Sequence, residues 1–198
     1  MIILDHEQGT EEWLAARLGK PSASNFSKLI TAAGKPSSSA DKYIDLLVAE
    51  RLTGKSEPFY TNDHMARGNE LEPEAREAYE FISGNTVTEH GFILDDSEEF
   101  GCSPDGLIDD GGLEIKCGAQ GTHAGYLRDP QIAVKKYYHQ IQGCMWVCDR
   151  KWWDLFLYHP EMSHVLVRVE RDDQFIEALA IEVEKAVNVI LNQVEKHQ

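Results

Sequence analysis

The stretch SPDGLIDDGGLEIKC, which runs from Ser103 to Cys117, decides how the sequence is interpreted. It combines turn-forming residues with four acidic residues and one lysine. Asp109-Asp110-Gly111-Gly112 is typical of a hairpin turn. We therefore expect two short strands, over residues 106–108 and 113–117, that lie next to each other.

The second strand of this hairpin has a polar face. Side chains alternate between the two faces of a strand, so Glu114 and Lys116 share one face. The other face carries Leu113, Ile115 and Cys117 and can go into the core. The return of the chain through the hairpin can bring Asp105 alongside Glu114. The sequence therefore predicts that two carboxylates and one ammonium group converge on one point.

This trio suits a hard divalent cation. Mg²⁺ takes oxygen ligands and usually only one or two carboxylates, and water and substrate phosphate complete its shell. Asp105 and Glu114 are the predicted ligands, and the backbone carbonyl of Ile115 can add a third oxygen. Lys116 can orient a water molecule or stabilise charge that develops on the phosphate, which is the chemistry of phosphodiester hydrolysis. Mn²⁺ is a possible substitute for Mg²⁺. A hairpin with ordinary solvent-exposed charges is the alternative.

The remaining sequence predicts one α/β domain over residues 1–198. Helical patterns dominate the first half, strand patterns the middle, and a helix, two strands and a long helix follow. The predicted helices cover residues 10–19, 24–33, 41–52, 71–82, 135–147 and 173–195, and the predicted strands cover residues 85–94, 100–103, 106–108, 113–117, 152–159 and 164–170.

The composition is that of an ordinary globular protein, with 42% apolar and 27% charged residues. No apolar run approaches the roughly 18 residues that a membrane helix needs, and the N-terminal residues lack the basic start of a secretion signal. We therefore expect a cytoplasmic protein without a membrane partner. The four cysteines are expected to be reduced, and their spacing disfavours a four-cysteine metal cluster because only Cys144 and Cys148 form a close pair.

The formal net charge of −15 at first disfavours nucleic acid as a partner, because contacts to phosphate need Lys and Arg. Two facts weaken this objection. Carboxylates that gather around a metal count as negative until the metal binds, and the 19 basic residues can be concentrated in one cleft. The charge therefore remains compatible with an enzyme that acts on DNA.

Four stretches resemble a known family: MARGNELEPEAREAYEFISG (65–84), CSPDGL (102–107), LEIKC (113–117) and YHQIQGCMWV (138–147). Together they are similar to the phage lambda exonuclease and YqaJ-like viral recombinase family of PD-(D/E)xK nucleases. Pro104-Asp105 and Glu114-Ile115-Lys116 match the signature of that superfamily. The resemblance extends from Trp13 to near the C-terminus. It implies a restriction-endonuclease-like core, in which helices flank a central mixed β-sheet.

The resemblance assigns roles to the site residues. Asp105 and Glu114 match the metal-binding carboxylates, with the Ile115 carbonyl as a further ligand, and Lys116 matches the catalytic lysine. Glu72 matches an upstream acidic residue on a helix that shapes the metal site; an exposed helix face is the alternative, and Glu70 and Glu74 fit that role better. Gln140 matches a glutamine that approaches from the crossover helix, with Gln142 as the alternative. His64 is an alternative metal ligand that we do not expect to be a principal one.

Arg17, Ser24 and Ser103 resemble the family's pocket for the 5′-phosphate of a DNA end. Arginine offers a fork of donors that matches phosphate, and a serine near a helix start adds its hydroxyl to free backbone N–H groups. Each has an ordinary alternative. Arg17 can be a cation favoured at a helix C-terminus, Ser24 an N-cap and Ser103 a turn residue.

The resemblance implies a Mg²⁺-dependent 5′→3′ exonuclease, a hydrolase that degrades one strand of linear double-stranded DNA to mononucleotides. It also implies a ring-shaped homotrimer and a phage single-strand annealing protein as partner in recombination, inside a bacterial host cell. Lys28, Lys35, Lys42 and Arg67 are candidates for the DNA channel. Trp152 and Trp153 can stack on bases, although at least one is expected in the core. The alternatives are an endonuclease or Cas4-like enzyme of the same fold, and a DNA-end-binding module without catalysis.

Overall fold

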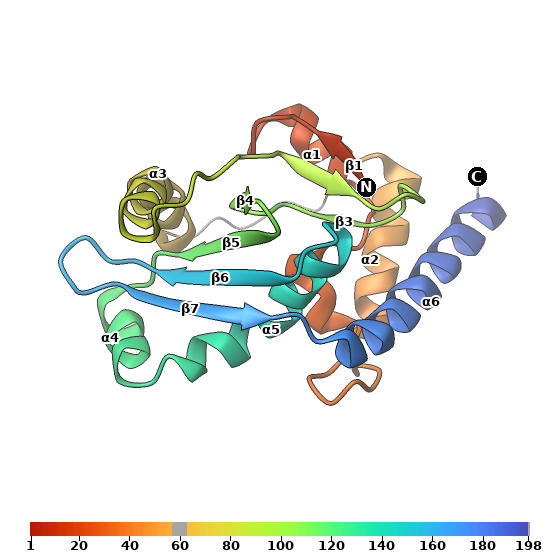
Figure 1. Ribbon diagram of the computed structural model, residues 1–198. Helices are drawn as coiled ribbons and strands as arrows, with labels where there is room; N and C mark the ends of the chain where they lie inside the picture. The colour runs from red at the N-terminus through yellow and green to blue at the C-terminus, as the bar shows by residue number, and fades with distance from the viewer. Residues whose placement is uncertain (57–62, 198) are drawn as a thin grey trace.

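The computed structural model describes residues 1–56 and 63–197, and the side chains of residues 63–66 and 69 lie outside this description. The strands form two sheets (Figure 1). One has three antiparallel strands in the order β1-β2-β3, and the other has four strands in the order β4-β5-β6-β7. The strands are β1 (Ile2–Leu4), β2 (Phe92–Leu94), β3 (Gly101–Cys102), β4 (Gly106–Ile108), β5 (Gly111–Lys116), β6 (Trp152–Leu157) and β7 (Val165–Glu170).

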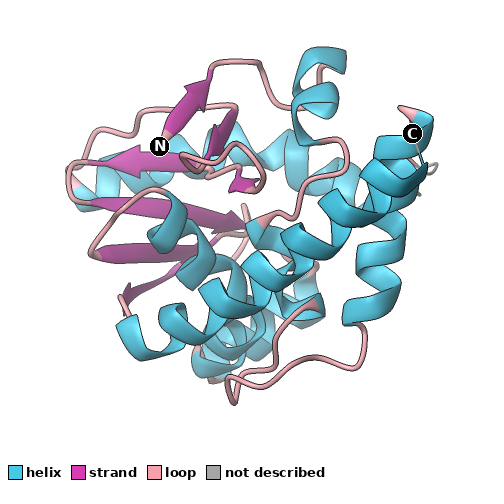
Figure 2. Cartoon of the chain, turned by 90° about the vertical axis from the view of Figure 1, so that its right-hand side faces the viewer, coloured by secondary structure: helices cyan, strands magenta, loops and turns pink. Residues whose placement is uncertain are grey.

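Helices flank the four-stranded sheet (Figures 1 and 2). Helix α3 packs on one side of the sheet and α5 on the other. The long helix α6 packs against α2 at one end of the molecule. This arrangement confirms the prediction of an α/β fold with a mixed sheet between helices. The helices are α1 (Glu11–Arg17), the short 3-10 helix η1 (Ala23–Lys28), α2 (Ala40–Thr53), α3 (Asp63–Ser83), α4 (Gln120–Arg128), α5 (Gln131–Val147) and α6 (Asp173–His197).

The predicted hairpin is present as β4 and β5, which pair antiparallel from Gly106–Leu113 to Ile108–Gly111. On its other edge β5 pairs with β6 in parallel. A parallel pair needs a long crossover, and α4 and α5 supply it. Gly112 is required where the two strands meet, because a Cβ atom at this position would collide with the ring of Trp153.

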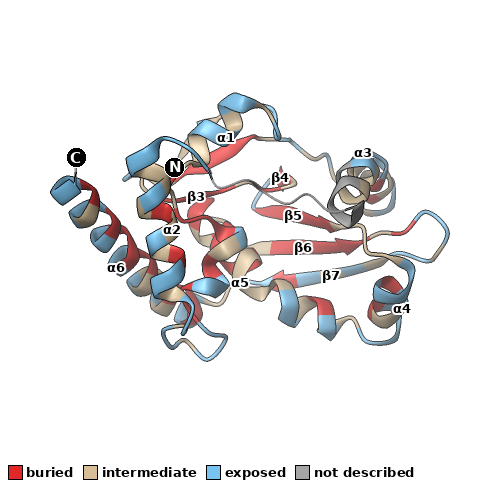
Figure 3. Ribbon diagram, turned by 180° about the vertical axis from the view of Figure 1, so that it is seen from behind, coloured by how far each residue is buried: buried red, intermediate tan, exposed pale blue. Residues whose placement is uncertain are grey.

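The sheet separates two apolar clusters, and both faces of β5 and β6 are covered (Figure 3). On the α3 side, Ala75 and Tyr79 pack against Leu113 and Ile115 of β5. Trp153 is fully buried on the α5 side, which confirms that one of the two tryptophans belongs to the core. Trp152 is half-buried beneath the guanidinium group of Arg168, whose carbon lies 3.6 Å from the ring centre.

The four cysteines are free thiols that lie on different sides of the sheet. Cys102, Cys144 and Cys148 belong to the α5-side cluster, whereas Cys117 packs against the α3-side cluster. This separation argues against one centre formed by all four. In the described ranges, 1–56 and 63–197, no helix combines the length and the apolar character needed to cross a bilayer.

The prediction of a helix over residues 24–33 is wrong. The chain forms only η1 and then turns back, with the Thr31 amide bonded to the Lys35 carbonyl at 2.8 Å. Short polar side chains explain the difference, because they bond to one another and to nearby backbone instead of supporting a helix. Asn25 donates to the Ser22 hydroxyl at 3.3 Å, and the hydroxyls of Ser22 and Ser24 are 3.3 Å apart.

Several predicted boundaries also shift. Helix α3 begins at Asp63 and not at residue 71, so Pro73 lies inside the helix and not in its first turn. The strand predicted over residues 85–94 is reduced to β2, and Thr88 forms only a single bridge with Leu107 of β4. Strand β1 and helix α4 were not predicted.

Candidate active site

The polar face of β5 meets helix α5 at the C-terminal end of the strand. Glu114 is completely buried, and its Oε1 atom forms an ion pair with the Lys116 ammonium group. From α5, the Gln140 side-chain amide donates to the same carboxylate oxygen at 2.6 Å. The Lys116 nitrogen also lies 5.2 Å from the ring centre of Tyr137. The structure thus brings Glu114, Lys116 and Gln140 together.

Asp105 reaches β5 from the turn that leads into β4. Its Oδ2 atom accepts a hydrogen bond from the Ile115 amide at 2.6 Å. Asp105 directly precedes Gly106, the first residue of β4 that pairs with β5. The N–H and C=O groups of one strand residue point to the same side. The Ile115 carbonyl is therefore directed to the edge of β5 where Asp105 lies.

The carboxylates of this cluster, Glu72, Asp105 and Glu114, outnumber its two cations, Lys116 and Arg76. Burial raises the pKa of Glu114 to about 8, and Asp105 adds to this effect while Lys116 opposes it. Burial and the neighbouring Asp105 raise the pKa of Glu72 to about 7. Burial also raises the pKa of Asp105. Carboxylates whose pKa values are raised although Lys116 and Arg76 lie beside them are in surroundings that favour a further cation.

The donor atoms fit a magnesium-like ion. The Oε2 atom of Glu114 is buried and has no hydrogen-bond partner within the part of the chain that the structure describes. Among the described residues, no group of three or more His, Cys, Asp or Glu side chains is arranged to hold a metal ion. Two carboxylates and the Ile115 carbonyl are nevertheless a sufficient protein contribution for Mg²⁺, which keeps several positions for water and phosphate.

Glu72 lies on α3, where it is half-buried and borders the same cavity as Asp105. Its Oε1 atom accepts from Arg76, one helical turn further, at 2.7 Å. Glu70 and Glu74 are exposed on the helix. The structure therefore places Glu72, and neither of its neighbours, next to the predicted metal site. The side chain of His64, the alternative ligand, lies outside the described residues.

Gln142, the alternative to Gln140, is directed elsewhere. Its amide nitrogen donates to the Glu170 carbonyl at 2.9 Å, and its oxygen accepts from the Asp172 amide at 2.9 Å. It thereby joins α5 to the connection between β7 and α6. Two residues along a helix place these side chains in different directions, and the packing of α5 decides that Gln140 faces Glu114.

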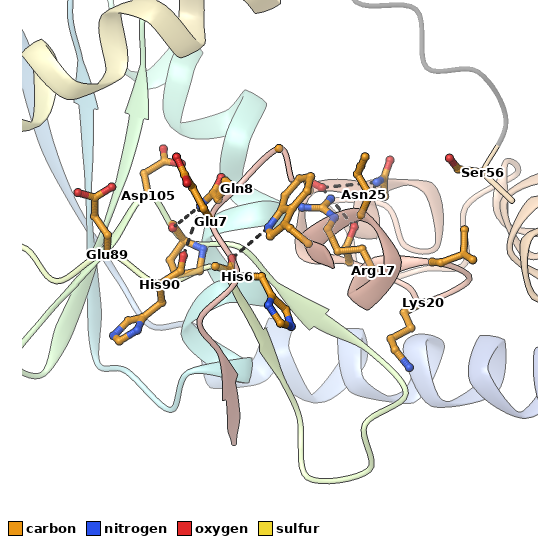
Figure 4. A pocket seen from close by; sticks show the side chains of 18 of the residues that line it. His6, Glu7, Gln8, Arg17, Lys20, Asn25, Ser56, Glu89, His90 and Asp105 are labelled. Atoms are coloured by element: carbon orange, nitrogen blue, oxygen red, sulfur yellow. Dashed lines mark hydrogen bonds between the residues drawn. The ribbon is translucent and has the colours of Figure 1, made fainter. Parts of the chain in front are cut away.

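A cavity of about 1420 Å³ borders Asp105 and Glu72 and extends toward α1 and η1. Figure 4 shows Asp105 and Glu89 at one end of it and Arg17 and Asn25 toward the other. Ser24 also borders the cavity. One continuous space therefore connects the predicted metal site with the predicted phosphate pocket.

Arg17 lies between aromatic rings and reaches Ser103. Its guanidinium carbon is 4.1 Å from the ring centre of Trp13 and 5.5 Å from that of Phe92, and its Nη1 atom donates to the Ser103 hydroxyl at 3.0 Å. Burial lowers the pKa of Arg17. Among the side chains that the structure describes, no carboxylate lies within ion-pair distance of this guanidinium group. A half-buried cation without an acidic partner is suited to an anion.

Ser24 is exposed at the edge of the cavity and is not an N-cap, because Ser22 occupies that position of η1. Arg17 does lie in the last turn of α1, so its position alone also fits the helix-dipole alternative. Among the predicted channel residues, Lys28 borders the cavity, whereas Lys35 and Lys42 are exposed elsewhere. Arg67 donates to the Gly118 carbonyl at 3.1 Å, close to the end of β5.

Two residues of this region were missed by the sequence analysis. Trp13 contacts Arg17 and donates its indole N–H to the Ser103 hydroxyl at 3.2 Å. Arg76 contacts Glu72 and the backbone of Asp105. Each lies four positions from a predicted site residue on the same helix, and this spacing, which puts side chains on one face, was the available signal.

The chain is similar to a known protein family and to solved structures. A model of the YqaJ-like viral recombinase domain matches residues 12–151. The chain is similar to LHK-Exo, an alkaline exonuclease from Laribacter hongkongensis, with 36% sequence identity and a TM-score of 0.84 over 94% of this chain and 95% of that chain. The structure of LHK-Exo in complex with dAMP gives the same values.

A phage-related exonuclease from Haemophilus somnus 129PT has the same fold at 20% identity, with a TM-score of 0.72 over 90% of this chain and 96% of that chain. The curated proteins contain no match to the chain.

Proposed function

Since the chain belongs to the YqaJ-like viral recombinase family and is a phage-type DNA exonuclease, we propose that it is a Mg²⁺-dependent 5′→3′ exonuclease that acts on linear double-stranded DNA. One observation carries the proposal: a single cavity borders both Asp105, at the metal site, and Arg17, at the phosphate pocket. A DNA end whose 5′-phosphate is bound near Arg17 would direct its first phosphodiester bond toward Asp105.

The proposed chemistry distributes roles among the residues of β5 and its neighbours. A divalent cation held by Asp105, Glu114 and the Ile115 carbonyl would polarise the scissile phosphate. Gln140 fixes the Glu114 carboxylate through its 2.6 Å hydrogen bond. Lys116 stabilises the negative charge that develops on the phosphate, because an ammonium group in a buried site is a strong electrostatic partner.

The state of Lys116 favours this role over that of a general base. Burial lowers its pKa, but the negative charges of Glu114 and Asp105 raise it by more, so the net shift is upward. Ionised Glu114 therefore keeps Lys116 protonated, and the protonated lysine can donate hydrogen bonds. A general base would need a pKa near the operating pH.

The remaining parts of the proposal rest on family membership. The enzyme releases mononucleotides, a view supported by the dAMP complex of LHK-Exo, and leaves a 3′ single strand for phage recombination. It acts as a ring-shaped homotrimer beside a phage single-strand annealing protein, in the cytoplasm of a bacterial host. Mn²⁺ substitutes for Mg²⁺.

A time course on linear duplex DNA with Mg²⁺ tests the proposal, with one strand labelled at a time. We expect loss of the 5′-phosphorylated strand, release of mononucleotides and no cutting of closed circles, with Glu114→Ala as the inactive control. Cleavage of circles would instead identify an endonuclease. DNA binding without cleavage of any substrate would identify an end-binding module.

Arg17→Ala is expected to slow digestion of 5′-phosphorylated ends about 10- to 100-fold, the value of a lost hydrogen bond to a charged group. Ends with a 5′-hydroxyl should be affected much less, because they offer no phosphate to Arg17. The ratio of the two rates is the measurement. Arg128, an exposed arginine in the last turn of α4, provides a matched control as Arg128→Ala. An equal loss on both kinds of end would remove Arg17 from the phosphate pocket.

A further inference from the structure

Arg76 joins three separate segments of the chain. Its Nη2 atom bonds to Glu72 on α3 at 2.7 Å, and its Nη1 atom bonds to Glu89 at 2.9 Å. Its Nε atom donates to the backbone carbonyl of Asp105 at 3.3 Å. The Arg76 side chain is only 13% exposed. All three nitrogens of the guanidinium group therefore have a partner within the chain.

The contact between Arg76 and Asp105 lies in a turn whose backbone is outside the β4–β5 ladder. The ladder between β4 and β5 begins at Gly106, one residue after Asp105. Two side chains from outside bind successive carbonyls of this turn: Gln8 donates to that of Pro104 at 3.2 Å, and Arg76 donates to that of Asp105. The direction of the Asp105 carboxylate thus depends on these contacts as well as on its own bond to the Ile115 amide.

The partners of Arg76 are themselves fixed in place. Thr88, which precedes Glu89, exchanges two backbone hydrogen bonds of 2.9 Å with Leu107 of β4. Glu89 is therefore anchored next to the strand that follows Asp105. A planar guanidinium group imposes one relative arrangement on the three groups it contacts, whereas the single ammonium group of lysine cannot bond to all three in that geometry.

We propose that Arg76 is a positioning residue for the metal site, which sets the Asp105 turn and Glu72 relative to Glu114. This inference rests on the proposed function, because it concerns the divalent cation of that site. The competing explanation is a stabilising ion pair without influence on the site. That explanation predicts a lower melting temperature and an unchanged metal affinity.

Arg76→Lys separates the two explanations, because it keeps the positive charge and removes the fork. The full-length protein is titrated with Ca²⁺ by calorimetry in the absence of DNA. Loss of a residue that orients metal ligands typically weakens metal binding about 10- to 100-fold, and we expect a loss in this range. In cleavage assays, the Mg²⁺ concentration for half-maximal rate should rise by a similar factor, and the rate at saturating Mg²⁺ should fall less.

Arg168→Gln is the matched control. Arg168 also bonds to a buried carboxylate, that of Asp154, through two hydrogen bonds of 2.9 and 3.0 Å, but on strands β7 and β6. This variant should lower the melting temperature and leave the Ca²⁺ affinity unchanged. An equal loss of Ca²⁺ affinity in Arg168→Gln would attribute the effect to general destabilisation and overturn the inference.

Unchanged Ca²⁺ affinity in a folded Arg76→Lys protein would also overturn it. If Arg76→Lys does not fold, Glu89→Ala carries the test, because Glu89 is 65% exposed and its loss removes only the outer partner of Arg76. Weaker Ca²⁺ binding would then support the inference, and unchanged binding would refute it. A wild-type protein that neither binds Ca²⁺ nor cleaves DNA with Mg²⁺ would refute the proposed function as well. If the wild type is active and the Arg76→Lys variant equals it in Ca²⁺ affinity and in Mg²⁺-dependent cleavage, only the positioning role is refuted.

Discussion

Replacement of Lys116 by alanine should reduce cleavage of linear duplex DNA at least about 10²- to 10³-fold, the effect of removing one charge-stabilising donor from an active site. DNA binding should remain nearly intact. Lys116 is paired with the buried carboxylate of Glu114 at the proposed metal site and is not among the residues that line the cavity. The measurement is a single-turnover cleavage rate, with binding followed by fluorescence anisotropy in Ca²⁺.

Lys151→Ala is the control for this variant. Lys151 also forms an ion pair, with Asp110 at 2.8 Å, but its side chain is 76% exposed beside the turn between β4 and β5. The Lys151→Ala variant should cleave linear duplex DNA at the wild-type rate. Substantial cleavage by Lys116→Ala would exclude Lys116 from the mechanism, and parallel losses of binding and cleavage would make it a DNA contact.

Replacement of Glu114 by glutamine should abolish both cleavage and the stabilisation of the protein by divalent cations. A ligand that binds only the folded state adds about 2.7 kcal/mol to the free energy of unfolding at a concentration one hundred times its Kd. The wild type should gain this amount from Ca²⁺, as measured by chemical denaturation, and Glu114→Gln should gain almost none. Glutamine keeps the size of the side chain but removes the charge that holds the ion.

The same carboxylate predicts how metal binding depends on pH. The pKa of Glu114 is raised by burial to about 8, from an ordinary value of 4.5. Metal binding requires the ionised form, so Ca²⁺ affinity should increase as the pH rises toward about 8 and level off above it. In the absence of metal, the stability of the fold depends on pH in the opposite direction. The stabilising contribution of protonated Glu114 to the free energy of unfolding is complete below pH 4.5 and is lost as the pH rises through about 8.

Asp154→Asn is the control for Glu114→Gln, because Asp154 is also a buried carboxylate, on the neighbouring strand β6. It accepts hydrogen bonds from Arg168 and Tyr79 and should lose stability without losing the response to Ca²⁺. Ca²⁺ stabilisation that persists in Glu114→Gln would place the metal elsewhere.

The sequence was most informative where structure is local. The turn residues Asp109 to Gly112 and the alternation around Glu114 were sufficient to predict the β4–β5 hairpin and the common face of Glu114 and Lys116. These contacts span few residues and depend on turn chemistry and on the two-residue period of strands. Helix α4 was not predicted because its segment, QGTHAGYLR, contains two glycines and little apolar periodicity.

Long-range packing could not be predicted in the same way. The choice between Gln140 and Gln142 depends on how α5 is rotated against the sheet, which the packing of α5 against η1 and β5 determines. The contact between Arg17 and Ser103 joins residues 86 positions apart. Resemblance to a family suggested both assignments, and neither follows from local periodicity. The start of α3 was misplaced because Pro73 suggested a first turn.

The parallel pairing of β5 with β6 has a consequence for the order in which the site is completed during synthesis. The crossover segment between them comprises residues 117–151, or 35 residues. At synthesis rates of about 5–20 residues per second, β6 leaves the ribosome about 2–7 s after the hairpin. During that interval one edge of β5 lacks its partner strand, and α5, which carries Gln140, is still incomplete for part of the time. A nascent chain therefore contains every residue of the signature before it contains a working nuclease.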